Sequence, residues 1–214
     1  DLALDYLLSL LSSAELEKFA NMYRNAPPIA AQSKTKINLA VKMESQRDYK
    51  YNDGRDGTHD KYQTCNVHAV SAVINYLTKK YVSPKALDDY IKKISGSRYS
   101  HASLAQALKH HGIISTFSTA TKTKDIIASL LAGSPVIWSN KLTHGGHIVV
   151  LCGVDLDNKF FIVADSYGQP FKSGSKWQYK DIRGNYKLSF AAFESSGMNG
   201  PLASGHWAHL LKLA

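Results

Sequence analysis

The chain has few cysteines and no long apolar run, and each shortage excludes a class of protein. Its 214 residues include only two cysteines, which excludes the dense disulfide framework of small secreted domains. No stretch reaches the ~18 consecutive apolar residues that a transmembrane helix needs. A basic segment followed by an apolar core and a cleavage site, typical of a secretory signal peptide, is also absent. We therefore expect a soluble protein whose cysteines stay free.

Internal repeats and low-complexity tracts are absent as well, and the composition fits one substantial domain with a small attachment. The sequence is 44% hydrophobic and 20% charged, enough apolar material for one sizeable core. Two amphipathic stripes precede it, made of Leu4, Leu7, Leu8 and Leu11 and then of Leu16, Phe19, Ala20 and Tyr23. Ser12 and Glu15 form a capping-box pattern between the stripes. We predict a helical hairpin over residues 1–28, docked or linking, and a main domain over residues 29–214.

Within the main domain, helical patterns come early and strand patterns come late. Helices are predicted over residues 65–77, 84–94, 103–111 and 123–131, and strands over residues 113–117, 135–138, 148–154, 159–164, 187–193 and 207–213. The hairpin-like spacing of the late strands favours antiparallel pairing. This division indicates the α+β class, with helices packed against an antiparallel sheet.

Cys65 begins the first of these helices, and its position favours reactivity. Apolar residues recur at helical spacing after it, so that one face of residues 65–77 packs on a core. At a helix N-terminus the macrodipole and free N–H groups favour a thiolate and lower the thiol pKa from its free value of about 8.5. Cys152 lies instead inside the apolar run 148–154, where an unpaired cysteine is usually a small core residue. We predict that Cys65 is a nucleophile and that Cys152 is packing.

A histidine and an aspartate follow on two predicted strands. His147 comes directly after Gly145 and Gly146, and glycines let the backbone approach a ligand closely, so both are candidate substrate contacts. The chain then turns at residues 157–158 and returns antiparallel to Asp165, which brings this carboxylate beside the imidazole. A carboxylate in that place fixes the imidazole tautomer and stabilises its charged form. The thiol, the imidazole and the carboxylate are thus predicted to act as nucleophile, base and orienting group.

Together these residues resemble the C39-like branch of the papain-like cysteine peptidases. The resemblance rests on Gln46, on residues 64–67 at the helix start, and on residues 132–137, 145–150 and 163–167. It covers roughly residues 37–190 and implies a papain-like fold with Cys65 as nucleophile, His147 as general base and acid, and Asp165 as orienting group. The chain departs from the family pattern at Ser166, where the family commonly has proline, a change that affects the turn more than the chemistry.

The family also implies a glutamine upstream of the cysteine that donates to the oxyanion. Gln63 precedes Cys65 by only two residues, whereas Gln46 lies before what the sequence indicates is an inserted surface loop over residues 52–60. A loop of that length can fold Gln46 back beside the thiol. We predict Gln46 as the donor, with Gln63 as the alternative.

The inserted loop and several histidines raise the question of a metal. Asp53, Asp56 and Asp60 are separated by glycines and offer the oxygen ligands that calcium accepts, but they do not match the EF-hand spacing, and Asp-Gly clusters are mostly plain turns. Zinc needs three or four converging ligands, and His206 and His209 fall on opposite faces of a predicted strand. We expect no cofactor, with calcium as a weaker alternative.

Charge bears on the substrate. Residues 29–214 hold 24 Lys and Arg against 13 Asp and Glu, a balance that favours anionic partners such as nucleic acid, lipid or cell wall. The basic residues are scattered and no nucleic-acid module signature is present, so we expect no specific nucleic-acid partner. A basic cysteine peptidase without a signal peptide resembles phage lysins. We therefore expect an antimicrobial, endolysin-like enzyme that cleaves peptide bonds in bacterial peptidoglycan, delivered by phage or released at lysis.

Two alternatives stay open. One is a peptidase that removes leader peptides after a double glycine, as C39 domains do in bacteriocin exporters, which would be expected to precede membrane spans and an ATP-binding domain. The other is a peptide-binding module of the same fold without catalysis. The intact set of Cys65, His147 and Asp165 argues against the second.

Overall fold

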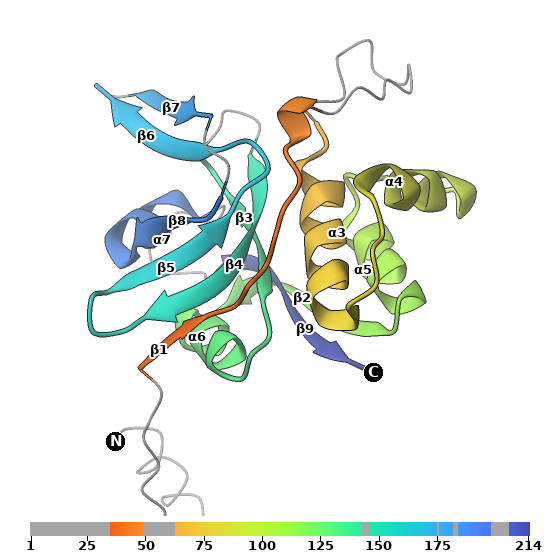
Figure 1. Ribbon diagram of the computed structural model, residues 1–214, viewed down its shortest axis with the longest axis horizontal. Helices are drawn as coiled ribbons and strands as arrows, with labels where there is room; N and C mark the ends of the chain where they lie inside the picture. The colour runs from red at the N-terminus through yellow and green to blue at the C-terminus, as the bar shows by residue number, and fades with distance from the viewer. Residues whose placement is uncertain (1–34, 49–62, 143–145, 175, 182–183, 198–205) are drawn as a thin grey trace, which may run out of the picture. The chain divides into compact units, whose positions relative to one another are not determined.

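The computed structural model describes residues 35–48, 63–142, 146–174, 176–181, 184–197 and 206–214 (Figure 1). These belong to one compact unit that extends from Lys34 to Ala214. The predicted helical hairpin over residues 1–28 lies outside the described residues and stays a prediction.

Seven antiparallel strands form the central sheet of the described part. They are β1 (Lys36–Asn38), β2 (Ile113–Thr121), β3 (Val136–Asn140), β4 (His147–Asp155), β5 (Phe160–Ala164), β8 (Tyr186–Ser189) and β9 (His206–Leu213). The strand order is β2-β9-β3-β4-β5-β8, and β1 pairs with the far end of β4, beyond β3. A separate two-stranded sheet contains β6 (Gln169–Ser173) and β7 (Lys176–Lys180).

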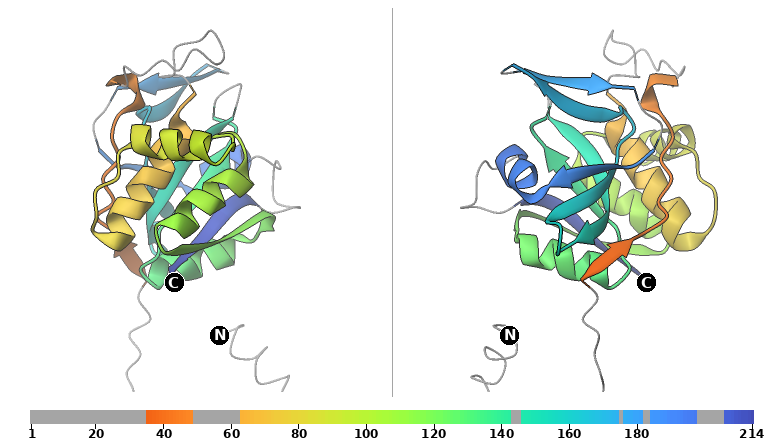
Figure 2. Two further views of the ribbon diagram at one scale, coloured as in Figure 1. Left: turned by 90° about the vertical axis from the view of Figure 1, so that its right-hand side faces the viewer. Right: turned by 60° about the vertical axis from the view of Figure 1, so that its left-hand side comes forward.

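The helices are α3 (Cys65–Thr78), α4 (Pro84–Lys93), α5 (His101–His110), α6 (Thr123–Leu131) and α7 (Phe190–Ser196), with a 3-10 turn, η1 (Gln46–Asp48). Figures 1 and 2 show α3, α4 and α5 together on one side of the sheet and α7 on the other. The predicted α+β class is therefore confirmed, with the cysteine helix packed against an antiparallel sheet. None of the described helices is both long and apolar enough to cross a membrane.

Helix α3 is held by its apolar stripe. Val67, Val70, Val73 and Ile74 are fully buried, and the helix packs against β4. Burying a side chain of this size contributes roughly 1.5–3 kcal/mol relative to its exposed state. Since β4 is buried along almost its whole length, its run of apolar residues is explained by cover on both faces.

One predicted strand is partly wrong. The sequence pattern favoured a strand over residues 187–193, but β8 ends at Ser189 and α7 begins at Phe190. The Ser189 side chain accepts a hydrogen bond from the backbone N–H of Ala192, which is the N-cap geometry that starts a helix. Local capping therefore overrides the apolar alternation at this point.

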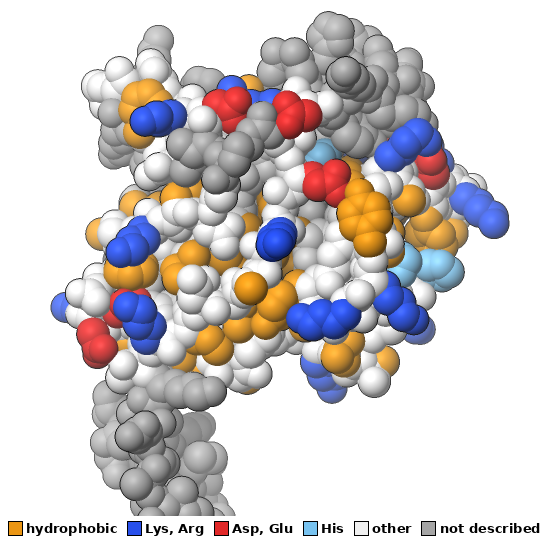
Figure 3. Space-filling model, in the orientation of Figure 1, with side chains coloured by type: hydrophobic (Ala, Val, Ile, Leu, Met, Phe, Trp, Pro, Cys, Tyr) orange, Lys and Arg blue, Asp and Glu red, His pale blue; other side chains and the backbone are white. Residues whose placement is uncertain are grey.

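Basic side chains are spread over the face of the molecule that Figure 3 shows. Lysine and arginine side chains are scattered across this face, and apolar and uncharged side chains lie between them. The predicted scatter of basic residues is thus seen on this face.

Candidate active site

The cysteine helix begins at the predicted residue. Helix α3 starts at Cys65, after Thr64 as N-cap, and Thr64 supplies no side-chain capping bond. The carbonyl oxygen of Thr64 instead accepts a hydrogen bond from the backbone N–H of His68, and it lies 2.7 Å from Nδ1 of the His68 side chain. Cys65 is a free, partly exposed cysteine at the N-terminus of α3, which is the positive end of the helix dipole.

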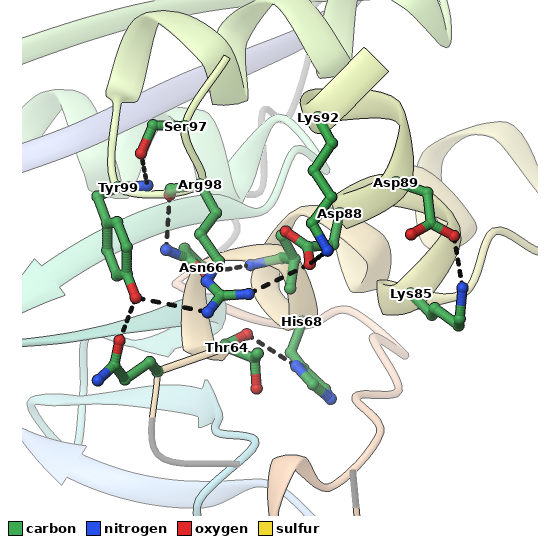
Figure 4. Close-up of polar contacts among 12 residues, drawn as sticks. Thr64, Asn66, His68, Lys85, Asp88, Asp89, Lys92, Ser97, Arg98 and Tyr99 are labelled. Carbon is green, nitrogen blue, oxygen red and sulfur yellow. Dashed lines mark hydrogen bonds and ion pairs between the residues drawn. The ribbon is translucent and has the colours of Figure 1, made fainter. Parts of the chain in front are cut away.

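A buried polar network fixes the first turn of α3 (Figure 4). Asn66, the residue after the cysteine, donates from Nδ2 to the carbonyl of Arg98 at 2.6 Å. Arg98 in turn places Nη1 3.2 Å from Oδ2 of Asp88, which also pairs with Lys92 at 3.2 Å. Arg98 and Asp88 are both almost completely buried. The loop after α4 therefore sets the position of the residue beside Cys65.

His147 and Asp165 meet across the hairpin of β4 and β5. His147 is the first residue of β4, and Asp165 directly follows β5. The Nε2 atom of His147 lies 2.7 Å from Oδ1 of Asp165, and the two residues are only 5% and 8% exposed. Oδ1 also accepts the backbone N–H of Tyr167 at 2.8 Å, while Oδ2 accepts the hydroxyl of Tyr186 at 3.3 Å. The carboxylate is thus held on both oxygens.

The Cys65 thiol and the His147 ring interact electrostatically, and each shifts the pKa of the other. Because Nε2 faces Asp165, Nδ1 is the ring nitrogen left for the sulfur. Burial raises the pKa of the Cys65 thiol, but the hydrogen bond to His147 and the charge of that ring lower it, and the net pKa lies below its ordinary value. Burial lowers the pKa of His147, yet the charge and hydrogen bond of Asp165 outweigh it, with a contribution from Cys65, and raise it to about 10. This arrangement favours a thiolate beside an imidazolium.

The structure therefore brings together the three residues that the sequence singled out for catalysis. Their roles as nucleophile, base and orienting group stay predictions. Cys152, by contrast, is fully buried on β4, and burial raises its pKa to about 12.

The two glutamines point to different surroundings. Gln46 is buried in η1. Its Oε1 accepts a hydrogen bond at 2.6 Å from the hydroxyl of Ser166, the residue that follows Asp165. Its backbone N–H also donates to the Ser166 carbonyl at 2.9 Å. Gln63 lies instead beside Tyr99, the neighbour of Arg98 in the chain, and its Oε1 accepts the hydroxyl of Tyr99. The geometry thus ties Gln46 to the carboxylate side of the site, and the choice of oxyanion donor stays a prediction.

Of the two candidate substrate-contacting glycines, Gly145 lies outside the described residues. Gly146 has a φ of +79°, a value that strains residues with a side chain. Gly146 directly precedes His147, so this backbone conformation sets the direction in which β4 begins.

Two aromatic residues lie around the imidazole and were assigned no role from the sequence, although one of them belongs to residues 163–167, which resemble the family. The rings of Tyr167 and Tyr179 both meet the His147 ring edge-on, at centroid distances of 6.3 Å and 5.7 Å. Arg47 covers the Tyr167 ring at 4.2 Å and donates from Nε to its carbonyl at 2.7 Å. Tyr167 could have been noticed because it follows Asp165 by two residues, but Tyr179 carries no such signal.

Candidate metal ligands do not converge in the described part of the chain. No group of three or more His, Cys, Asp or Glu side chains there could hold a metal ion, and the predicted calcium ligands Asp53, Asp56 and Asp60 lie outside it. His206 and His209 turn to different neighbours on β9. His209 bonds the His101 ring at 2.9 Å, whereas the His206 ring lies against Glu194.

Comparison with known proteins identifies a family and solved structures that are similar to this chain. The model of the Peptidase_C39 like family matches residues 38–198. No curated protein matches the chain. Among solved structures, the chain is similar to the crystal structure of a double glycine motif protease from an AMS/PCAT transporter in complex with the leader peptide. The two share 16% identity over 70% of this chain and 84% of that chain, with a TM-score of 0.47.

Proposed function

Because the chain belongs to the Peptidase_C39 like family, we propose that it is a cysteine peptidase or amidase that uses Cys65, His147 and Asp165. The observation that carries this proposal is the 2.7 Å contact between the His147 imidazole and the buried Asp165 carboxylate, together with the interaction of the same ring with the Cys65 thiol that lowers the pKa of that thiol. A nucleophile activated by an adjacent base, which a third group orients, is the arrangement that covalent hydrolysis requires.

In the proposed reaction the Cys65 thiolate attacks the carbonyl carbon of a peptide bond. A C–S bond forms, and the proton of the His147 imidazolium passes to the nitrogen as the C–N bond breaks. Water then attacks the thioester with the neutral imidazole as base, the C–S bond breaks, and the thiolate and the imidazolium form again. Asp165 keeps the ring in one orientation. The backbone N–H of Cys65 and the side-chain amide of Gln46 are the proposed donors to the oxyanion.

Peptidoglycan is the substrate that we propose. The chain carries a formal charge of +9, and its basic side chains are spread over the face in Figure 3 without forming a single cluster. Such a surface attracts a polyanionic matrix over a broad area, as bacterial walls with peptidoglycan carboxylates and teichoic acids provide. The proposed cleavage is therefore of stem-peptide or cross-bridge bonds, in the manner of a lysin.

Incubation with purified peptidoglycan, followed by mass analysis of the released fragments, tests both the activity and the bond. We expect soluble fragments with new amino and carboxyl termini from the wild type and none from Cys65→Ala. A peptide with a double glycine, tested in parallel, distinguishes the proposed wall substrate from the leader-peptidase alternative. Cleavage of that peptide alone would show that the enzyme is a leader peptidase and not a wall hydrolase. Failure to cleave either substrate would favour a binding module.

A further inference from the structure

Tyr179 lies on the small hairpin of β6 and β7, which pairs with no strand of the central sheet among the described residues. Figure 1 shows this hairpin at the same end of the molecule as η1 and the start of α3. The Tyr179 ring meets the His147 ring at 5.7 Å and 80°, and it meets the Tyr167 ring at 5.2 Å and 80°. The hairpin therefore brings a phenol directly against the imidazole of the candidate site.

The hydroxyl of Tyr179 is buried and has no hydrogen-bond partner in the described part of the chain. A buried hydroxyl in this state is unfavourable, and in native proteins it calls for a specific explanation. Tyr186 provides the contrast, because its buried hydroxyl donates to Asp165. Burial and the charges of Asp165 and Cys65 raise the pKa of Tyr179 above its ordinary value, so the group stays an O–H donor. The Tyr179 hydroxyl is thus a buried hydrogen-bond donor with no acceptor in the described part of the chain.

We propose that Tyr179 is a substrate-binding residue that recognises the leaving-group side of the peptide, an inference that rests on the proposed peptidase function. His147 must protonate the leaving amine, so the ring lies on the leaving side of the scissile bond. Tyr179 packs on that ring. Its hydroxyl donates to a backbone carbonyl oxygen of the residue that contributes the leaving amine. The contact exists in the bound substrate as well as in the transition state, so its loss raises KM and leaves kcat nearly unchanged.

The test compares Tyr179→Phe with the wild type on two substrates. The first is a synthetic peptide with the sequence of a peptidoglycan peptide that the wild type cleaves. The second is the p-nitroanilide of the same acyl-side sequence, which lacks every residue on the leaving side. We expect the KM for the peptide to rise about tenfold, the scale of one buried hydrogen bond, and the KM for the anilide to stay the same.

Tyr90→Phe on α4, where the ring stacks on His110, serves as a matched control and should change neither KM. The melting temperature of Tyr179→Phe should not fall, because the hydroxyl that it loses has no partner in the described part of the chain. A purely structural role predicts instead a lower melting temperature or equal effects on both substrates, and either result overturns the inference. An unchanged KM for the peptide overturns it too, while the peptidase function stands. If the wild type cleaves no peptide, the proposed function fails and this inference fails with it.

Discussion

Nε2 of His147 lies 2.7 Å from Oδ1 of Asp165, inside a region where both side chains are almost fully buried. The carboxylate therefore determines which ring nitrogen is left for the Cys65 thiol. It also determines the charge of the ring, because its field and hydrogen bond outweigh the effect of burial on the His147 pKa. Tyr186 and the backbone of Tyr167 hold the same carboxylate from two further directions.

Asp165→Asn should shift the pH dependence of catalysis. The carboxylate is the largest cause that raises the pKa of His147, so its removal lowers that pKa and the imidazolium deprotonates at lower pH. The alkaline limb of kcat/KM, where the proton donor is lost, should therefore move to lower pH. We also expect kcat to fall by about two to four orders of magnitude. Steady-state kinetics between pH 5 and 10 measure both effects.

Asp157→Asn is the control for this prediction because Asp157 lies at the exposed turn between the same two strands. Its pH profile should match that of the wild type. An unmoved alkaline limb in Asp165→Asn would mean that the carboxylate does not govern the ring.

Cys65→Ala should abolish turnover, whereas Cys152→Ala should retain most activity. The Cys65 pKa is lowered beside His147, but burial raises the Cys152 pKa to about 12 and no thiolate forms there near neutral pH. Iodoacetamide at pH 7 should therefore modify Cys65 alone, which mass analysis of tryptic peptides detects. Cys152→Ala leaves a small cavity in β4 and should cost about 1–2 kcal/mol of stability. Equal loss of activity in two folded variants would remove Cys65 from its assigned role.

Local patterns explain why much of this site could be predicted from the sequence. The apolar stripe after Cys65 and the hairpin from His147 to Asp165 are signals within short segments, and both elements appear where expected. The proximity of Asp165 to His147 follows from hairpin length alone. The meeting of Cys65 with that hairpin, however, required family resemblance, since 82 positions separate it from His147.

Contacts made by tertiary packing could not be predicted. Tyr186 reaches Asp165 because β8 pairs with β5, and the sequence gives no register for that pairing. Tyr179 arrives through a hairpin outside the central sheet. The bond from Asn66 to the Arg98 carbonyl links segments 32 residues apart, with no periodic signal to reveal it.

Asp88→Ala should destabilise the protein far more than Asp89→Ala, its neighbour on α4. Asp88 is fully buried and pairs with the buried Arg98, so its removal leaves a buried cation without this partner and should cost about 3–5 kcal/mol. Asp89 pairs with Lys85 on an exposed face, where such a pair contributes only about 0.3–0.5 kcal/mol. Urea denaturation of both variants measures the difference. Equal free energies of unfolding would show that the network in Figure 4 does not stabilise the fold.

The last prediction separates the two glutamines. Gln46→Ala should lower kcat by two to three orders of magnitude, because loss of one preorganised oxyanion donor costs roughly 2.7–4 kcal/mol in the transition state. The Oε1 atom of Gln46 accepts the Ser166 hydroxyl at 2.6 Å, and a side-chain amide donates through its nitrogen, so Nε2 is the atom that we propose as the oxyanion donor. Ser166→Ala removes this hydrogen bond to Gln46 and keeps the amide, so kcat should fall by about three- to tenfold, the scale of one hydrogen bond. Gln63→Ala should have a mild effect, because the Gln63 carbonyl oxygen is engaged by Tyr99 beside Arg98. Kinetics and melting temperatures of the three variants test the order. A large loss at Gln63 with Gln46→Ala near wild type would reverse the assignment and place the oxyanion on the side of Tyr99.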